Sequence, residues 1–87
     1  MARHKARAVA GPLAIARRGP SIHDAIENAI GALLLSNPTL LTGTKWVKVT
    51  CIVGNYRYAC KASEKGFMIP AEGERILTKA EADGDLG

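Results

Sequence analysis

The sequence has few aromatic residues, few cysteines and no long apolar run. One Trp, one Phe and two Tyr among 87 residues are too few for the multi-base stacking surface of an RNA-recognition domain. Two cysteines exclude a disulfide-rich scaffold and a four-cysteine zinc site. The longest apolar run, residues 29–35, is far shorter than the roughly 20 residues of a membrane-spanning helix. Since Gly11-Pro12 also breaks the uncharged stretch near the start, we expect no signal peptide, no membrane contact and a cytoplasmic protein.

Motifs of catalysis and of cofactor binding are lacking as well. The chain contains no GxSxG and no GxGxxG, and residues 42–45 (TGTK) lack the upstream glycine of a phosphate-binding loop. His4 and His23 stand outside any metal-binding spacing, and no two carboxylates are spaced for acid–base work. We therefore expect neither an enzyme nor a bound cofactor or metal.

Charge is distributed unevenly along the chain, whose net charge is +4. Residues 1–20 carry five basic residues and no acid, whereas residues 71–87 carry five acids and two basic residues. A basic end of this kind suits a phosphate backbone or an acidic protein surface. With 47% hydrophobic residues, a chain of this length is expected to form one small core.

Residues 22–36 have the pattern of an amphipathic helix. Ser21 is suited to cap its N-terminus, and Asp24 lies three residues later, as in a capping box. Asn37-Pro38 ends the segment, because the residue before a proline disfavours helical geometry. The apolar residues follow helical spacing and form one continuous stripe: Ile22, Ala25, Ile26, Ala29, Ile30, Leu33 and Leu34.

A β-hairpin is predicted for residues 46–62. Its two halves are rich in β-branched and aromatic residues, and Gly54-Asn55 between them favours a type I′ or II′ turn. A two-residue turn puts the apolar residues on one face, which the helix is expected to cover, and leaves a basic face in solvent. The pairs expected on the covered face are Val53 with Tyr56, Cys51 with Tyr58, Val49 with Cys60 and Val47 with Ala62.

The segments on either side of these elements are weaker. We expect a short third strand at Phe67–Ile69, a short helix at about residues 71–82 and a disordered acidic tail at residues 83–87. The predicted fold is therefore α+β, with one amphipathic helix packed on a small antiparallel sheet, in a single domain spanning residues 21–82.

Residues 1–20 are predicted to be a basic N-terminal arm or an edge strand. Gly11-Pro12 favours a bent strand at the sheet edge, since proline cannot donate to a strand ladder. In that case Val9, Leu13 and Ile15 are expected to point inward.

Cys51 and Cys60 lie in the two halves of the hairpin. With a two-residue turn they are diagonal neighbours on the core side, which favours two buried, reduced thiols. A four-residue turn would put them directly opposite each other, where a disulfide is feasible.

These observations predict a small non-catalytic protein that occupies the surface of a partner, as accessory and inhibitor proteins of phages and mobile elements do. An exposed Ile52, the Leu40-Leu41 loop and an unpaired sheet edge would serve a protein partner or a second copy of the chain. The alternative is nucleic-acid binding through the basic hairpin face and the basic arm, with Trp46 stacking on a base. In both cases the expected contact residues are Arg3, Lys5, Arg7, Arg17, Arg18, Trp46, Lys48, Arg57 and Lys61.

Overall fold

The computed structural model describes residues 3–42, 45–70 and 77–78 of the chain. None of the helical segments in these ranges has the length and apolar character of a membrane span. In chain order the elements are β1 (His4–Ala10), β2 (Leu13–Gly19), α1 (Ile22–Ser36), the 3-10 turn η1 (Pro38–Leu41), β3 (Val47–Val53), β4 (Tyr56–Ser63), β5 (Gly66–Met68) and β6 (Leu77–Thr78).

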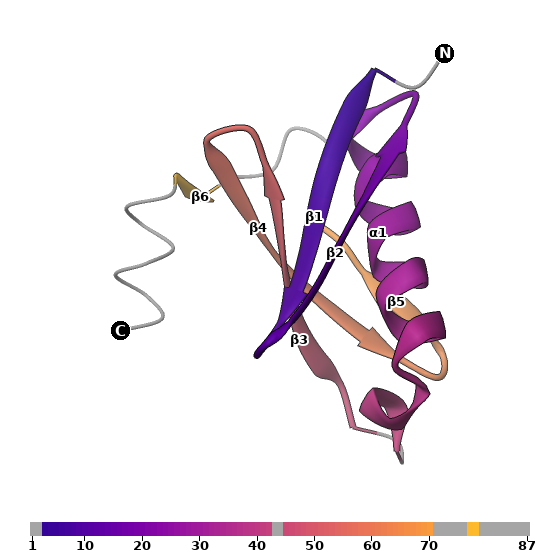
Figure 1. Ribbon diagram of the computed structural model, residues 1–87. Helices are drawn as coiled ribbons and strands as arrows, with labels where there is room; N and C mark the ends of the chain where they lie inside the picture. Colours follow the sequence, from indigo (N-terminus) through magenta and orange to yellow (C-terminus); the bar gives the residue numbers. More distant parts are fainter. Residues whose placement is uncertain (1–2, 43–44, 71–76, 79–87) are drawn as a thin grey trace.

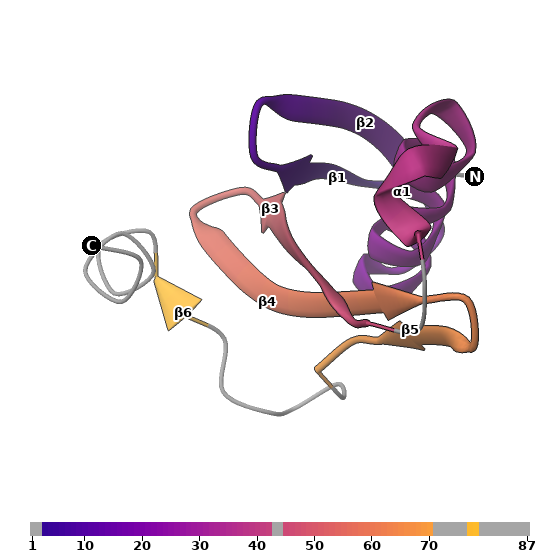
Figure 2. The same ribbon diagram turned by 90° about the horizontal axis from the view of Figure 1, so that it is seen from below.

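The strands form one antiparallel sheet with α1 on one face (Figures 1 and 2). The strand order is β2-β1-β3-β4-β5, and β6 pairs with β4 outside this path. This arrangement confirms the predicted α+β fold, in which one helix packs on an antiparallel sheet.

The helix has the bounds that its sequence predicts. Ser21 caps it, because the backbone N–H of Asp24 donates to the Ser21 hydroxyl oxygen at 3.1 Å. At the other end, the backbone N–H and the side-chain amide of Asn37 both donate to the Leu33 carbonyl oxygen, at 3.0 and 2.9 Å. The expected stripe is buried except for Ile22, which lies in the first turn and is partly exposed.

The hairpin of β3 and β4 has the predicted register and a two-residue turn. Val49 faces Cys60 and Cys51 faces Tyr58, and all four side chains are buried. The expectation for Tyr56 is wrong in one respect, because this side chain is 48% exposed. Tyr56 starts β4 next to the turn, away from β1 and β2, on which α1 mainly packs.

The N-terminal segment is a second hairpin: β2 lies at the edge of the sheet, as the edge-strand alternative predicted, whereas β1 is an internal strand and the described residues do not form an arm. Gly11 has φ +60° and, with Pro12, joins β1 to β2 in full register, which fits the first position of a type II′ turn. β1 also pairs with β3, so the segment belongs to the central part of the sheet. The inward residues of β1 are Ala6, Ala8 and Ala10, whereas Val9 lies on the other face, contrary to the expectation.

The helix covers β1 and β2 more than the β3–β4 hairpin that it was expected to cover. The reason is visible in β1, where Ala6 and Ala8 are fully buried and their small side chains let the helix approach closely. Leu13 and Ile15 of β2 pack against the same core, as predicted. One cluster of buried residues therefore joins both hairpins and the helix.

The third strand is confirmed as β5, which pairs with the end of β4. The helix expected at residues 71–82 is not confirmed: Leu77–Thr78 is a strand, β6, and the remainder lies outside the described residues. The tail expected at residues 83–87 also lies outside them.

Candidate functional site

The candidate site lies on the face of the sheet that is turned away from α1. We call it the outer face and define it by the strand residues that alternate with the core residues. None of them is buried. They are Lys5, Arg7 and Val9 of β1, Ala14, Ala16 and Arg18 of β2, Lys48, Thr50 and Ile52 of β3, Arg57, Ala59 and Lys61 of β4, and Met68 of β5.

Six of these residues are basic and none is acidic. The three carboxylates of the described ranges lie elsewhere: Asp24 and Glu27 on α1, and Glu64 in the turn after β4. Cations of the N-terminal segment and of the β3–β4 hairpin, which are more than 25 residues apart in sequence, thus share one face. The pairing of β1 with β3 brings them together.

The strand register puts basic residues directly opposite one another. Lys5 pairs with Arg18 across β1 and β2, and Lys48 pairs with Lys61 across β3 and β4. Like charges in directly opposed positions destabilise a sheet. The outer face therefore carries two repulsive cross-strand pairs that the fold itself does not require.

The cations form two groups. The four-cation group consists of Lys5, Arg7, Arg18 and Arg57, and the lysine pair consists of Lys48 and Lys61. Between them runs an uncharged row, in which consecutive residues are cross-strand partners; we call it the middle row. It consists of Ala14, Val9, Thr50 and Ala59.

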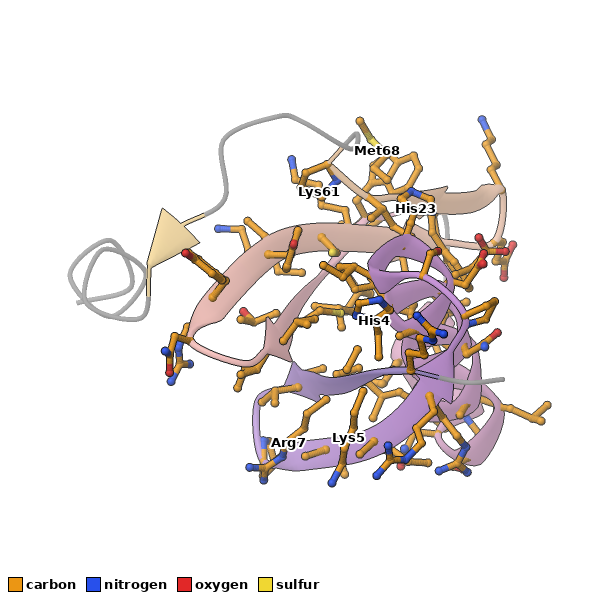
Figure 3. The ribbon with its side chains drawn as sticks, turned by 90° about the horizontal axis from the view of Figure 1, so that it is seen from above. His4, Lys5, Arg7, His23, Lys61 and Met68 are labelled. Carbon is orange, nitrogen blue, oxygen red and sulfur yellow. The ribbon has the colours of Figure 1, made fainter. Side chains whose placement is uncertain are left out.

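The labelled cations of the outer face do not all point in the same direction. Figure 3 shows Lys5 and Arg7 directed to one side and Lys61 and Met68 directed to the other, with the strands between them. Neighbouring strands rotate by about 20–25° relative to each other, so side chains of β1 and β4, which are two steps apart in the sheet, diverge on the outer face. His4, which alternates with Lys5, lies on the helix side and is half-buried.

Three of the nine predicted contact residues are not part of the outer face. Arg17 belongs to the helix-facing side of β2, although it is exposed, and its guanidinium donates to the Ala16 carbonyl oxygen at 2.7 Å. Arg3 precedes β1, where its backbone N–H donates to the Gly19 carbonyl oxygen at 3.2 Å. Trp46 directly precedes β3 and is 44% exposed.

The apolar contact surface expected for a protein partner is smaller than predicted. Leu40 and Leu41 lie in η1 and pack against the core, so they do not form an exposed loop. Ile52 is half-buried between Arg7 and Arg57, its partners on the two neighbouring strands. The predicted open edge is present at β2, which pairs with β1 alone among the described strands.

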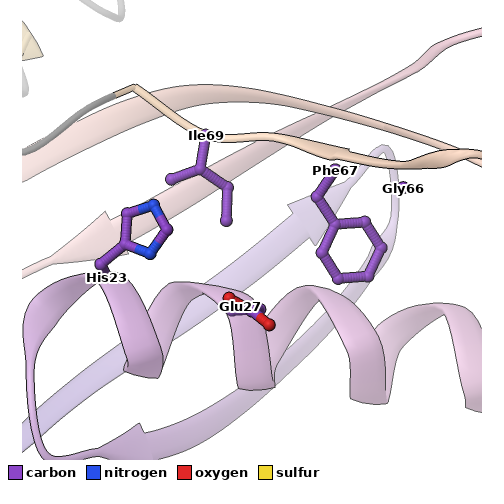
Figure 4. Close-up of a pocket in the computed structure, with 5 residues that line it drawn as sticks. All are labelled: His23, Glu27, Gly66, Phe67 and Ile69. Atoms are coloured by element: carbon purple, nitrogen blue, oxygen red, sulfur yellow. The ribbon is translucent and has the colours of Figure 1, made fainter.

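An open pocket of about 400 Å³ lies between α1 and β5 (Figure 4). His23 and Glu27, one helical turn apart, line one side, and Phe67 and Ile69 line the other. Nothing in the sequence predicts this pocket, because its two sides come together only when β5 pairs with β4 and lies beside the helix. The described lining offers one carboxylate and one imidazole but no hydroxyl, thiol or amine side chain, and no group of three metal-binding side chains occurs in the described ranges.

Both cysteines are buried and free, as favoured by the two-residue turn. The Cys51 thiol donates a hydrogen bond to the Cys60 sulfur. This hydrogen bond and burial raise the pKa of Cys51 far above its ordinary value. Such a thiol is a poor nucleophile at neutral pH, since the thiolate is the reactive form.

The outer face is thus the part of the described structure where the predicted contact residues gather. Alternation in β1, with Lys5 and Arg7 between small apolar residues, was the sequence signal that could have revealed it. The prediction for the N-terminal segment was an arm or a bent edge strand, because Gly11-Pro12 was placed within one strand, whereas both residues lie in the turn between two strands. Comparison with protein-family models, curated protein sequences and solved structures found no match to this chain.

Proposed function

We propose that the protein binds nucleic acid, without catalysis, through the outer face of its sheet. The observation that carries this proposal is the pair of like-charge partners, Lys5 with Arg18 and Lys48 with Lys61, on a face without carboxylates in the described ranges. Phosphate groups bound between these side chains would relieve their repulsion. Release of counterions from the nucleic acid supplies the favourable free energy of such contacts.

The first of the two functions predicted from the sequence, a protein partner, has less support in the geometry. Leu40 and Leu41 contribute to the core, and the outer face is dominated by cations whose natural complement is a polyanion. If the protein does not bind nucleic acid, an acidic protein surface becomes the favoured partner. We also propose a cytoplasmic location, where thiols such as Cys51 and Cys60 stay reduced.

The proposal is tested with a charge-reversal variant that does not weaken the fold. In Arg18→Glu/Lys61→Glu, each like-charge pair becomes a pair of opposite charges. The matched control is Lys45→Glu/Lys65→Glu, which changes the net charge equally at two exposed lysines outside the outer face. Circular dichroism and thermal unfolding establish that both variants are folded.

Fluorescence anisotropy with labelled mixed-sequence oligonucleotides measures the affinity. We expect binding at about 50 mM salt that weakens steeply as salt increases, and a loss of about tenfold or more in the outer-face variant. The control variant is expected to change affinity by much less. Equal losses in the two variants, or no binding by the wild-type protein at low salt, would contradict the proposal.

A further inference from the structure

We infer that the nucleic acid bound by the outer face is a double helix, contacted along both of its phosphate backbones and without preference for sequence. This inference rests on the proposed function, because it assigns the ligand class of the same face. Three features support it: the side chains between the two cationic groups, the spacing of the groups, and their directions.

The outer face lacks the side chains that bind single strands. Proteins that bind single-stranded nucleic acid stack successive bases on aromatic rings along a basic groove. The outer face, as defined by its strand residues, contains no aromatic residue. Trp46, just before β3, is the nearest candidate and supplies at most one stacked base.

The spacing of the two cationic groups fits two backbones. Arg7 and Arg57 are both paired with Ile52, and Lys48 lies four residues from Ile52 along β3. Four residues of a strand span about 13 Å. That distance is close to the width of the DNA major groove, about 12 Å, which separates the two phosphate backbones.

The directions of the cations favour the same conclusion. Lys5 and Arg7 point to one side of the molecule and Lys61 to the other (Figure 3). A single strand would have to wrap around the sheet to reach both groups. Two backbones that flank one groove instead present phosphates to both cationic groups of a sheet face that lies across the groove. The face lies across the groove because a five-stranded sheet is wider than the two-stranded ribbon that a major groove admits.

The middle row has little capacity to read bases. Its residues are Ala14, Val9, Thr50 and Ala59. The Thr50 hydroxyl is therefore the one side-chain group in this row that can form a hydrogen bond. Discrimination between base pairs in the major groove needs bidentate donors and acceptors such as Arg, Asn or Gln. A row of small side chains permits close approach to the groove but no readout, which predicts binding independent of sequence.

The test compares one mixed-sequence DNA duplex of about two helical turns with each of its separated strands, under identical salt. An RNA duplex and a DNA duplex of shuffled sequence complete the set. We expect the DNA duplex to bind at least about tenfold more tightly than either strand, and the shuffled duplex to bind equally well. Because the major groove of an RNA duplex is deep and narrow, we expect the RNA duplex to bind more weakly, and equal affinity would overturn the spacing argument.

Variants of each cationic group test the two-backbone geometry. Two variants each remove two positive charges: Lys48→Gln/Lys61→Gln and Lys5→Gln/Arg7→Gln. In each, the slope of log affinity against log salt concentration is expected to decrease by the amount that about two phosphate contacts contribute. The charge-matched control is Lys45→Gln/Lys65→Gln, for which the salt dependence should stay unchanged. Trp46→Leu should leave duplex affinity unchanged.

The possible outcomes separate this inference from the proposed function. Single strands that bind as tightly as the duplex, especially if Trp46→Leu weakens them, would overturn the duplex assignment and leave nucleic-acid binding standing. If duplex binding depends on one cationic group alone, the two-backbone geometry is overturned. Absence of binding to every oligonucleotide would overturn both proposals.

Discussion

The backbone of Gly19 lies directly against the first turns of the helix, next to Ala25. A Cβ atom at Gly19 would come within 2.5 Å of the backbone nitrogen of Ala25 and within 2.9 Å of its Cα. These are backbone atoms of a capped helix, so they cannot move aside as a flexible side chain can. The contact fixes the end of β2 against α1 and thereby sets the angle between the helix and the N-terminal hairpin.

Replacing Gly19 with alanine is expected to destabilise the protein by about 1–3 kcal/mol, the cost of inserting a methyl group into a packed site. Urea unfolding followed by circular dichroism measures the change. An unfolding free energy equal to that of the wild type would show that the helix can shift away from β2.

Gly31→Ala is the matched substitution with the opposite expected sign. Gly31 lies inside α1, and a Cβ there would meet no atom within 4 Å. Alanine loses less backbone entropy in a helix, so we expect a gain of about 0.5–1 kcal/mol in the same urea experiment. A loss of stability would mean that an unrecognised contact occupies this side of the helix.

Ser21→Ala removes the side-chain acceptor for the backbone N–H of Asp24. We expect a loss of about 1 kcal/mol in unfolding free energy, whereas Ser21→Asp, which keeps an acceptor, should retain stability. Equal effects of the two substitutions would argue that the cap does not contribute.

Lys61→Glu is expected to separate stability from binding. It converts the repulsive pair with Lys48 into an attractive one, which should stabilise the sheet by about 0.2–1 kcal/mol at low salt. The same change should weaken oligonucleotide binding. If the variant is less stable as well as weaker in binding, partial unfolding would explain the weaker binding, and this prediction would be wrong.

The free energy of unfolding is expected to decrease as the pH rises above about 9, which is the ordinary pKa of a cysteine thiol. Because the pKa of Cys51 is raised in the folded state, the native protein keeps a proton that the unfolded chain releases. The unfolded state then binds fewer protons, so stability decreases with pH, by at most about 1.4 kcal/mol per pH unit for one thiol. Urea unfolding between pH 7 and 10.5 measures this slope.

Cys51→Ala/Cys60→Ala is the control for this pH dependence, since the two thiols titrate as a pair and this variant removes both of them from both states. The slope above pH 9 should decrease in this variant, and an unchanged slope would assign it to other groups such as Tyr58, whose pKa burial also raises. In the wild type, Ellman's reagent should react with the thiols only as fast as the protein opens.

Local sequence patterns determined the helix and the β3–β4 hairpin. The helix from Ile22 to Ser36 follows from its stripe and caps, and the pairing of Val49 with Cys60 follows from the two-residue turn. Each of these features depends on residues close together in sequence, whose geometry the chain specifies before any distant contact forms. The placement of Lys48, Arg57 and Lys61 on one face of the β3–β4 hairpin was predictable for the same reason.

The tertiary structure alone decided that the two basic segments form one surface. Arg7 faces Ile52 because β1 pairs with β3, an interaction between segments more than 40 residues apart that no local pattern encodes. Small side chains at Ala6 and Ala8 let the helix cover β1. Lys5 and Arg7, which alternate with these alanines, therefore belong to the outer face, the face of the sheet that also carries Lys48 and Lys61. Local periodicity specified which residues alternate along each strand, and long-range pairing, which depends on the packing of the whole core, specified which strands share a face.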